Sequence, residues 1–340
     1  MAIREQIIHI TRGESLTQEQ AAAAMEEIMS GVATPAQIAA FLTALALKGE
    51  TEAEIAGMAQ VMRARATPVS YDGPVLDTCG TGGDASGTFN ISTTSAFLAA
   101  GAGVTVAKHG NRAMSSVCGS ADVLEGLGVG IELDAAGVAH CLREAGIGFM
   151  FAPRFHPAMR YAGPVRREIG IRTVFNMLGP LTNPARARHQ VLGVADPLLA
   201  EKLAHALARL DTVHALVVHG HGGLDELALS GPNLIFDVRA DQPLRRYEID
   251  AADLGLPAAG RAEVLGGDVA RNVAIIRGIL TGEDSGARRD IVLLNAAAAL
   301  VAADRVGDLA EGIELARASL ESGAALARLE RMVAVSNQPV

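Results

Sequence analysis

After Pro68, short apolar or β-branched runs alternate with segments of helical character. The runs begin at Val75 (VLD), Val104 (VTVA), His214 (HALVVHG) and Asn233 (NLIFDV). Alternation of strand and helix predicts a mostly parallel sheet with helices on both faces, because each parallel connection needs a crossover. Such sheets bind ligands outside the carboxyl ends of their strands. We therefore expect any ligand site to lie at that edge of the sheet.

The N-terminal part of the chain has the pattern of several short helices. Three stretches, TQEQ at Thr17, TPAQ at Thr34 and TEAE at Thr51, fit the Ser/Thr-x-x-Glu/Gln capping box that begins a helix. Gly31 and Gly49 lie where the preceding helices should end. This spacing predicts helices packed on helices.

These two patterns predict two domains. We expect a small all-α domain over residues 1–68 and a larger α/β domain made of residues 69–162 and 187–340. The segment near 163–186 interrupts the strand–helix alternation and is rich in Pro, Asn and Arg. It is expected to return to the helical domain and join the two parts.

Composition excludes several classes of protein. The 340 residues carry a formal net charge of −9, which is unfavourable for a surface that binds nucleic acid or an anionic membrane. The cysteines, Cys79, Cys118 and Cys141, lack metal-ligand spacing, and no apolar stretch is long enough to span a bilayer. We expect a cytoplasmic protein in which an anionic ligand is held by a local cluster or by a metal.

The stretch VLDTCGTGGD, from Val75 to Asp84, is a strand that ends in a glycine-rich turn. Glycines allow backbone N–H groups to point at a phosphate, and FNISTTS after it places hydroxyls at a helix start, where an anion is favoured. The Gly-Lys-Ser/Thr ending of a P-loop is missing. A dinucleotide fold would place an acid after the next strand, whereas VTVA is followed by Lys108. The turn is interpreted as another kind of phosphate site, with an ordinary capped turn as the alternative.

The stretch KHGNR follows the second expected strand and is predicted to lie at the same edge. Lys108 offers a point charge to a phosphate, and Asn111 can both donate and accept hydrogen bonds. Ser115, Ser116 and Ser120 offer further donors. A solvated loop would explain any one of these residues but is a poor explanation of the whole set.

The strand HALVVHG leads into GGLDELALSG, which places Asp225 and Glu226 at a third carboxyl edge. Adjacent carboxylates on a loop suit Mg²⁺, which prefers oxygen ligands and keeps several waters. A pair of solvated acids is the alternative. A polyphosphate bound to an acidic protein favours the metal, because the metal neutralises the ligand.

Together these stretches resemble the anthranilate phosphoribosyltransferase family. The matching pieces, in the family's order, are DTCGTGGD, TFNIST, VAKHGNRAMSS with GSADVLEGLGV, PVRREIGIRTVFNMLGPLTNP and GLDELALSG. Pyrimidine nucleoside phosphorylases share the architecture and a similar lysine-histidine-glycine loop, but NMLGPLTNP and the NIST helix start favour the transferase. The resemblance implies the fold common to these two families and a homodimer that pairs through the helical parts.

The activity that the resemblance implies is transfer of the 5-phosphoribosyl group from phosphoribosyl pyrophosphate to the amine of anthranilate. Pyrophosphate would be released, Mg²⁺ would be the cofactor, and the reaction would be a step of tryptophan biosynthesis. A pyrimidine nucleoside phosphorylase is the alternative activity. A non-catalytic relative that binds a phosphoribosyl ligand or nucleic acid is the alternative class.

The resemblance also implies which residues hold the phosphoribosyl donor. They are Gly80, Gly83, Asp84, Thr88, Asn90, Ile91, Ser92, Thr93, Lys108, His109, Gly110, Asn111, Arg112, Ala113, Met114, Ser115, Ser116 and Ser120.

Anthranilate and the metal are assigned to smaller sets by the same resemblance. Anthranilate would meet Gly80, His109, Asn111 and Arg166. An arginine fork suits a planar carboxylate, although the residue pattern alone leaves Arg166 and Arg167 equally open. Mg²⁺ would contact Ser92, Asp225 and Glu226. No side chain is assigned to covalent chemistry, so catalysis is expected to be electrostatic, through Lys108 and the metal ligands.

Overall fold

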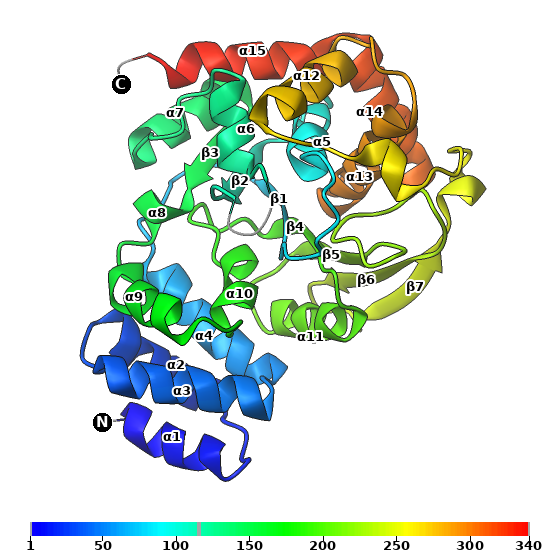
Figure 1. Cartoon of the computed structure of the whole chain (residues 1–340). Helices are drawn as coiled ribbons and strands as arrows, with labels where there is room; N and C mark the ends of the chain where they lie inside the picture. Colours follow the sequence, from blue (N-terminus) through cyan, green and yellow to red (C-terminus); the bar gives the residue numbers. More distant parts are fainter. Residues whose placement is uncertain (1, 114–116, 339–340) are drawn as a thin grey trace.

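The computed structural model describes residues 2–113 and 117–338. Three predicted donor residues, Met114, Ser115 and Ser116, lie outside these ranges. A group of helices that contains the N-terminus lies at one end of the molecule, and a sheet flanked by helices forms the rest (Figure 1).

The N-terminal helices begin where the capping boxes predict. They are α1 (Ala2–Thr11), α2 (Gln18–Met29), α3 (Pro35–Lys48) and α4 (Glu52–Arg65). Thr17, Thr34 and Thr51 each accept a hydrogen bond from the backbone N–H three residues on, and the side chain at that position accepts one from the cap N–H in return. The all-helical N-terminal part is confirmed.

The returning segment forms α9 (Met159–Ile169) and α10 (Phe175–Leu178), which pack on the N-terminal helices. Val165 and Leu178 share one apolar core with Phe41 of α3. The same core continues to Leu192 and Val217 under one face of the sheet. Because a single core spans helices and sheet, the exact domain boundaries stay a prediction.

The predicted mostly parallel sheet is confirmed. Within the described residues it has seven strands in the order β3-β2-β1-β4-β5-β6-β7. The first five in chain order pair in parallel, and β6 and β7 are antiparallel. The strands are β1 (Leu76–Gly80), β2 (Val106–Gly110), β3 (Ile147–Phe151), β4 (His189–Gly193), β5 (His214–His219), β6 (Asn233–Arg239) and β7 (Arg245–Ile249).

The remaining helices cover both faces of the sheet (Figure 1). Alternate residues of β5 face opposite sides: Leu216 joins the core under α5 (Ile91–Gly101) and α13 (Ala287–Ala302), whereas Val217 joins the core under α11 (Pro197–Ala208). These helices are α5 (Ile91–Gly101), α6 (Ser120–Gly126), α7 (Ala135–Ala145), α8 (Ala152–Phe155), α11 (Pro197–Ala208), α12 (Val269–Leu280), α13 (Ala287–Ala302), α14 (Leu309–Glu321) and α15 (Ala324–Ser336). Short 3₁₀-helices are η1 (Gly179–Leu181), η2 (Ala251–Leu254) and η3 (Arg261–Val264).

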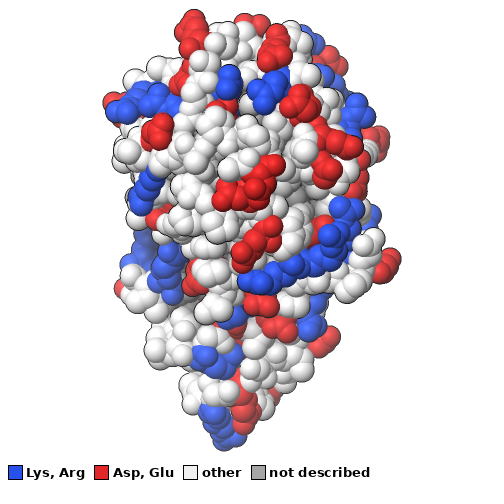
Figure 2. All heavy atoms as spheres, turned by 90° about the vertical axis from the view of Figure 1, so that its right-hand side faces the viewer, with Lys and Arg blue, Asp and Glu red and all other residues white. Residues whose placement is uncertain are grey.

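The surface carries charges of both signs. On the face drawn in Figure 2, acidic and basic side chains are interspersed, and that face has no broad basic field. None of the helices in residues 2–113 and 117–338 has both the length and the apolarity to cross a bilayer.

Candidate active site

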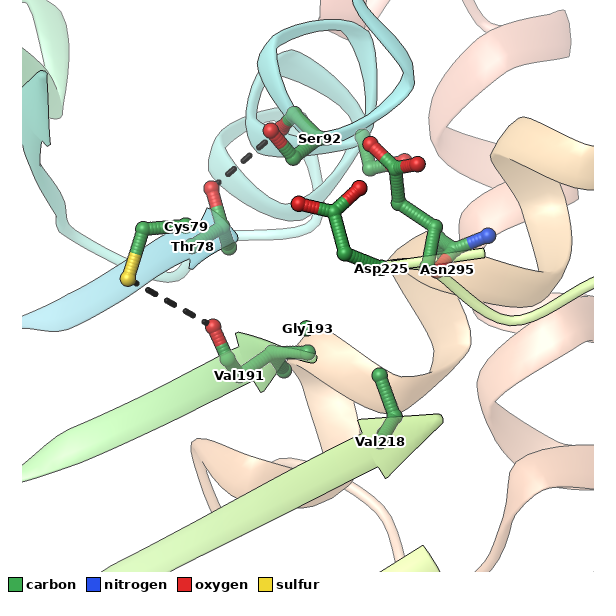
Figure 3. Close-up of a pocket in the computed structure, with 10 residues that line it drawn as sticks. Thr78, Cys79, Ser92, Val191, Gly193, Val218, Asp225 and Asn295 are labelled. Carbon is green, nitrogen blue, oxygen red and sulfur yellow. Dashed lines mark hydrogen bonds between the residues drawn. The ribbon is translucent and has the colours of Figure 1, made fainter. Parts of the chain in front are cut away.

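Two strand-end glycines let the loop after β5 reach the glycine turn. Gly80 and Gly193 end β1 and β4 and are paired with each other. A Cβ atom on Gly80 would overlap the Asp225 carboxylate, and one on Gly193 would overlap the Asp225 carbonyl oxygen. Glycine at both positions therefore allows Asp225, which follows β5, to lie across the end of β1. Figure 3 shows its carboxylate pointing toward Ser92.

The glycine turn is tied to this loop by a hydrogen bond. The backbone N–H of Gly82 donates to Asp225 Oδ2 at 2.8 Å. Farther along the turn, Ala85 has a left-handed backbone (φ 50°), which is unfavourable for a residue with a Cβ. Arg261 holds it there, because its guanidinium donates to the carbonyl oxygens of Ala85 and, at 2.6 Å, Ser86. Arg261 was not predicted from the sequence, because it is distant in the chain and belongs to no matching motif.

Three carboxylates meet beside the turn. One oxygen each of Asp84, Asp225 and Glu226 lies within 4.8 Å of the others. Burial, helped by the nearby Asp84 charge, raises the pKa of Asp225 to about 7. Burial also raises the pKa of Glu226 well above its ordinary value, with the charges of Asp225 and Asp84 adding to the effect. Three acids this close are costly without a cation to neutralise them.

The carboxylate cluster fits Mg²⁺. Among the described residues, buried Asp84 Oδ2 and Glu226 Oε2 have no hydrogen-bond partner, so both atoms are available as ligands. All donors are hard carboxylate oxygens, which Mg²⁺ prefers. The predicted pair, Asp225 and Glu226, is therefore joined by Asp84, which the sequence analysis assigned to the donor instead. Ser92 lines the same small cavity as Asp225 and Glu226.

The position of Lys108 differs from the expectation. Lys108, His109 and Gly110 belong to β2 itself and do not follow it. Lys108 is 3% exposed, and its ammonium donates to the carbonyl oxygen of Thr78 and, at 3.3 Å, to Ser92 Oγ. Burial lowers the pKa of Lys108, whereas the Asp77 charge opposes this shift. The lysine therefore delivers its charge from beneath the turn, between β1 and the start of α5.

Asp77 is a buried counter-charge that the sequence analysis missed. Its carboxylate accepts hydrogen bonds from Asn183 Nδ2 at 2.8 Å and from the backbone N–H of His109 at 3.2 Å. Burial raises the pKa of Asp77 to about 6, although Lys108 opposes the rise. Asn183 also donates to the carbonyl oxygen of Ala107 at 2.8 Å, so it connects β1, β2 and the returning segment. The sequence feature that could have identified Asp77 is the presence of an acid in the apolar run VLD.

His109 lies against a second buried histidine. Its Nε2 is 3.2 Å from Nε2 of His156, and each residue is 8% exposed. Burial lowers the pKa of His109 to about 3, helped by His156, and burial lowers that of His156 to about 4. Both rings are therefore neutral at pH 7. His109 is suited to hydrogen bonding and not to holding an anion by charge.

Other predicted donor residues either have buried side chains or make side-chain hydrogen bonds within the protein. The side chains of Ile91 and Thr93 are buried, so those residues can offer a ligand only backbone groups. The Asn90 side chain donates to Cys118 at 3.1 Å and accepts from Asn272 at 3.0 Å, which ties the start of α5 to α12. Thr88 shares a hydrogen bond of 3.0 Å with Ser86, at the far end of the glycine turn.

The stretch after β2 is organised by Asp122. Its carboxylate accepts from the backbone N–H groups of Ala113 and Gly119, both at 2.9 Å. Arg112 donates to Asp122 at 3.0 Å and to Glu125 at 2.8 Å, so its guanidinium is already paired. The hydroxyl of Ser120 donates to the carbonyl oxygen of Asn111 at 3.3 Å. Asn111, Arg112 and Ala113 are therefore held by hydrogen bonds to residues of α6.

Arg166 and Arg167 occupy different environments on α9. The Arg166 guanidinium lies over the Phe175 ring, 5.0 Å from its centroid, whereas Arg167 is exposed. Burial lowers the pKa of Arg166. Within the described part of the chain Arg166 has no carboxylate partner, so it is available to an acidic ligand.

Known proteins are similar to this chain over nearly its whole length. Residues 72–326 match the a/b domain of the glycosyl transferase family, and residues 4–66 match its helical bundle domain. An anthranilate phosphoribosyltransferase of Roseiflexus castenholzii is 75% identical over 337 residues, which cover 99% of each chain. The chain belongs to the anthranilate phosphoribosyltransferase family.

Other members of this family extend the comparison. A relative from Herpetosiphon aurantiacus is 64% identical over 99% of this chain and 100% of its own. The crystal structure of the enzyme from Thermus thermophilus matches with a TM-score of 0.92 and 45% identity, covering 98% of this chain and 99% of that one. The Saccharomyces cerevisiae enzyme, solved in complex with PRPP and Mg, matches with a TM-score of 0.87 and 27% identity over 97% of each chain.

Proposed function

We propose that this protein transfers the 5-phosphoribosyl group of phosphoribosyl pyrophosphate to the amine of anthranilate and releases pyrophosphate, as a step of tryptophan biosynthesis. The observation that carries the proposal is the meeting of the glycine turn, buried Lys108 and the acid cluster at one sheet edge. Asp225 joins these parts through its hydrogen bond of 2.8 Å from Gly82. The family's 75% identical member supports the choice of acceptor.

Donor binding uses the turn and the charges around it. Asp84, Asp225 and Glu226 would hold Mg²⁺, with Ser92 as a further ligand. When bound, Mg²⁺ neutralises negative charge that develops on the departing pyrophosphate. Lys108 adds a fixed positive charge from beneath the turn, where burial keeps water from screening it.

Anthranilate binding uses a different set of residues. Arg166 presents its guanidinium to the carboxylate, and stacking on Phe175 holds the fork in one plane. Asn111, neutral His109 and the backbone of Gly80 complete the acceptor site. The aniline nitrogen is already neutral at pH 7, so the reaction needs no strong base. Catalysis is then positioning plus electrostatic stabilisation of an oxocarbenium-like ribosyl centre.

The proposal includes a homodimer that pairs through its helical end and works in the cytoplasm. Exposed apolar side chains at that end support the pairing. Leu47 of α3 is 84% exposed, Val32 54% and Ile8 44%. A dimer that paired through this end would cover these side chains.

The decisive assay is the loss of anthranilate fluorescence when the purified protein is mixed with phosphoribosyl pyrophosphate and Mg²⁺. We expect loss that depends on the donor and stops with EDTA. A parallel reaction with uridine or thymidine plus phosphate should show no consumption of nucleoside. Nucleoside consumption without anthranilate loss would replace the transferase by a phosphorylase.

A further inference from the structure

Arg172, in the returning segment after α9, lies directly on the glycine turn. A Cβ atom built on Gly83 would be 2.5 Å from Arg172 Nη1 and 3.2 Å from its Cζ. The guanidinium therefore occupies the space that a side chain at position 83 would fill. Gly83 also has φ 78°, a backbone conformation that favours glycine. Arg172 belongs to the stretch PVRREIGIRTVFNMLGPLTNP, but the family resemblance implies no role for it.

The charge of Arg172 is unpaired, unlike those of other cations near this edge of the sheet. Arg172 is exposed and makes no hydrogen bond or ion pair with any residue in the ranges 2–113 and 117–338. By contrast, Arg112 is paired with Asp122 and Glu125. Arg261 is bonded to backbone carbonyl oxygens, and Lys108 lies buried beneath the turn. Arg172 is thus the guanidinium at the turn that is open to an arriving anion.

We propose that Arg172 is a further donor-binding residue, whose guanidinium binds the pyrophosphate group over the glycine turn. This inference rests on the proposed function and extends it by one residue. A guanidinium fork matches two phosphate oxygens, and it neutralises charge as pyrophosphate departs. It also offsets repulsion between the pyrophosphate and the nearby acid Asp84. The returning segment would then serve both substrates, with Arg166 on anthranilate and Arg172 on the donor.

The test compares Arg172→Gln and Arg172→Lys with Arg167→Gln. Arg167 is a matched control because it is an exposed arginine of the same segment with no assigned role. Two quantities are measured for each protein: steady-state constants for both substrates, and calorimetric binding of inorganic pyrophosphate with Mg²⁺. The melting temperature of each variant checks that an exposed substitution leaves the fold intact.

For Arg172→Gln we expect pyrophosphate affinity and kcat/KM for the donor to fall about 10- to 100-fold, the range for a lost charge-assisted hydrogen bond. The KM for anthranilate should stay within about twofold of the wild-type value, since that substrate is placed elsewhere. Arg172→Lys should recover part of the loss, because it restores the charge without the fork. Arg167→Gln should behave as the wild type.

Two results would overturn the inference while leaving the proposed function standing. One is unchanged pyrophosphate binding and donor kinetics in Arg172→Gln. The other is a rise confined to the KM for anthranilate, which would place Arg172 in the acceptor site. A wild-type protein that neither binds pyrophosphate nor consumes the donor would overturn the proposed function itself.

Discussion

Gly82 donates its backbone N–H to Asp225 Oδ2 at 2.8 Å, across a separation of 143 positions in the chain. The bond links the glycine turn to the loop that carries Asp225 and Glu226. A substitution that moves the glycine turn is therefore expected to move the Asp225 loop as well. It also leaves the second oxygen of Asp225 for a cation shared with Asp84 and Glu226.

Replacing both loop acids should nearly abolish turnover. Asp225→Asn with Glu226→Gln removes two of the three carboxylates that would hold Mg²⁺, so we expect kcat to fall on the order of 100-fold or more, as for other lost electrostatic contacts to a transition state. The Mg²⁺ concentration for half-maximal rate should rise. Initial rates over a Mg²⁺ series check this, and wild-type kinetics in the double variant would rule out the metal assignment.

The acid cluster should make metal-free protein less stable as pH rises. The folded-state pKa of Asp225 is raised to about 7 and that of Glu226 is raised as well, so the folded protein binds protons that the unfolded chain has released. The resulting stability is present below the unfolded pKa of about 4 and is lost as pH rises through the folded values. The wild type should therefore melt several degrees below Asp225→Asn/Glu226→Gln at pH 8 in EDTA.

Comparing the wild type with Asp225→Asn/Glu226→Gln at two pH values isolates the effect of this acid cluster from that of other titrating groups. At pH 5 the two melting temperatures should nearly coincide, because the wild-type carboxyls are protonated. Mg²⁺ should raise the wild-type melting temperature at pH 8 and leave the double variant unchanged, since ligand bound to the folded state stabilises it. A gap between the proteins that is equal at pH 5 and pH 8 would contradict the buried-acid account.

Loss of Arg166 should affect anthranilate more than the donor. Arg166→Ala removes the stacked guanidinium that we propose binds the acceptor carboxylate, so we expect the KM for anthranilate to rise about 10- to 100-fold. Arg167→Ala is the control on the same helix and should leave both constants unchanged. Steady-state kinetics with each substrate varied in turn measures both KM values. An equal rise in both would exclude Arg166 from the acceptor site.

A charge on the exposed end of α3 should disrupt pairing. Leu47→Glu places a carboxylate in the apolar surface proposed to be covered in the homodimer, where burying an unpaired charge is costly. Light scattering after gel filtration should show a dimer for the wild type and a monomer for the variant. Leu198→Glu, at a side chain 75% exposed on α11, is the matched control and should stay dimeric. A monomeric wild type would remove the homodimer from the proposal.

The predictable parts of the fold are those that depend on local interactions. Each capping box needs only residues three positions apart, so Thr17, Thr34 and Thr51 marked their helices correctly. The strands β3, β4 and β7 were not predicted. The buried run IGFMF of β3 lacks alternation, and β7 (RRYEI) is largely polar because it is an antiparallel edge strand.

The parts of the site that escaped prediction depend on contacts between distant segments. Asp84 joins Asp225 and Glu226 only because Gly80 and Gly193 end neighbouring strands, and β4 was not foreseen. Arg261 and Arg172 reach the turn from far along the chain, and single motifs do not reveal such approaches. Motifs therefore identified the residues at this edge, whereas the sheet order explains how they act together.

The most direct test of the central claim is the stoichiometry of one reaction. Wild-type protein is mixed with phosphoribosyl pyrophosphate, anthranilate and Mg²⁺, and pyrophosphate release is measured beside anthranilate consumption. We expect one pyrophosphate released per anthranilate consumed and no release when anthranilate is omitted. Pyrophosphate release without anthranilate consumption, or no reaction by folded protein, would contradict the transfer to this acceptor.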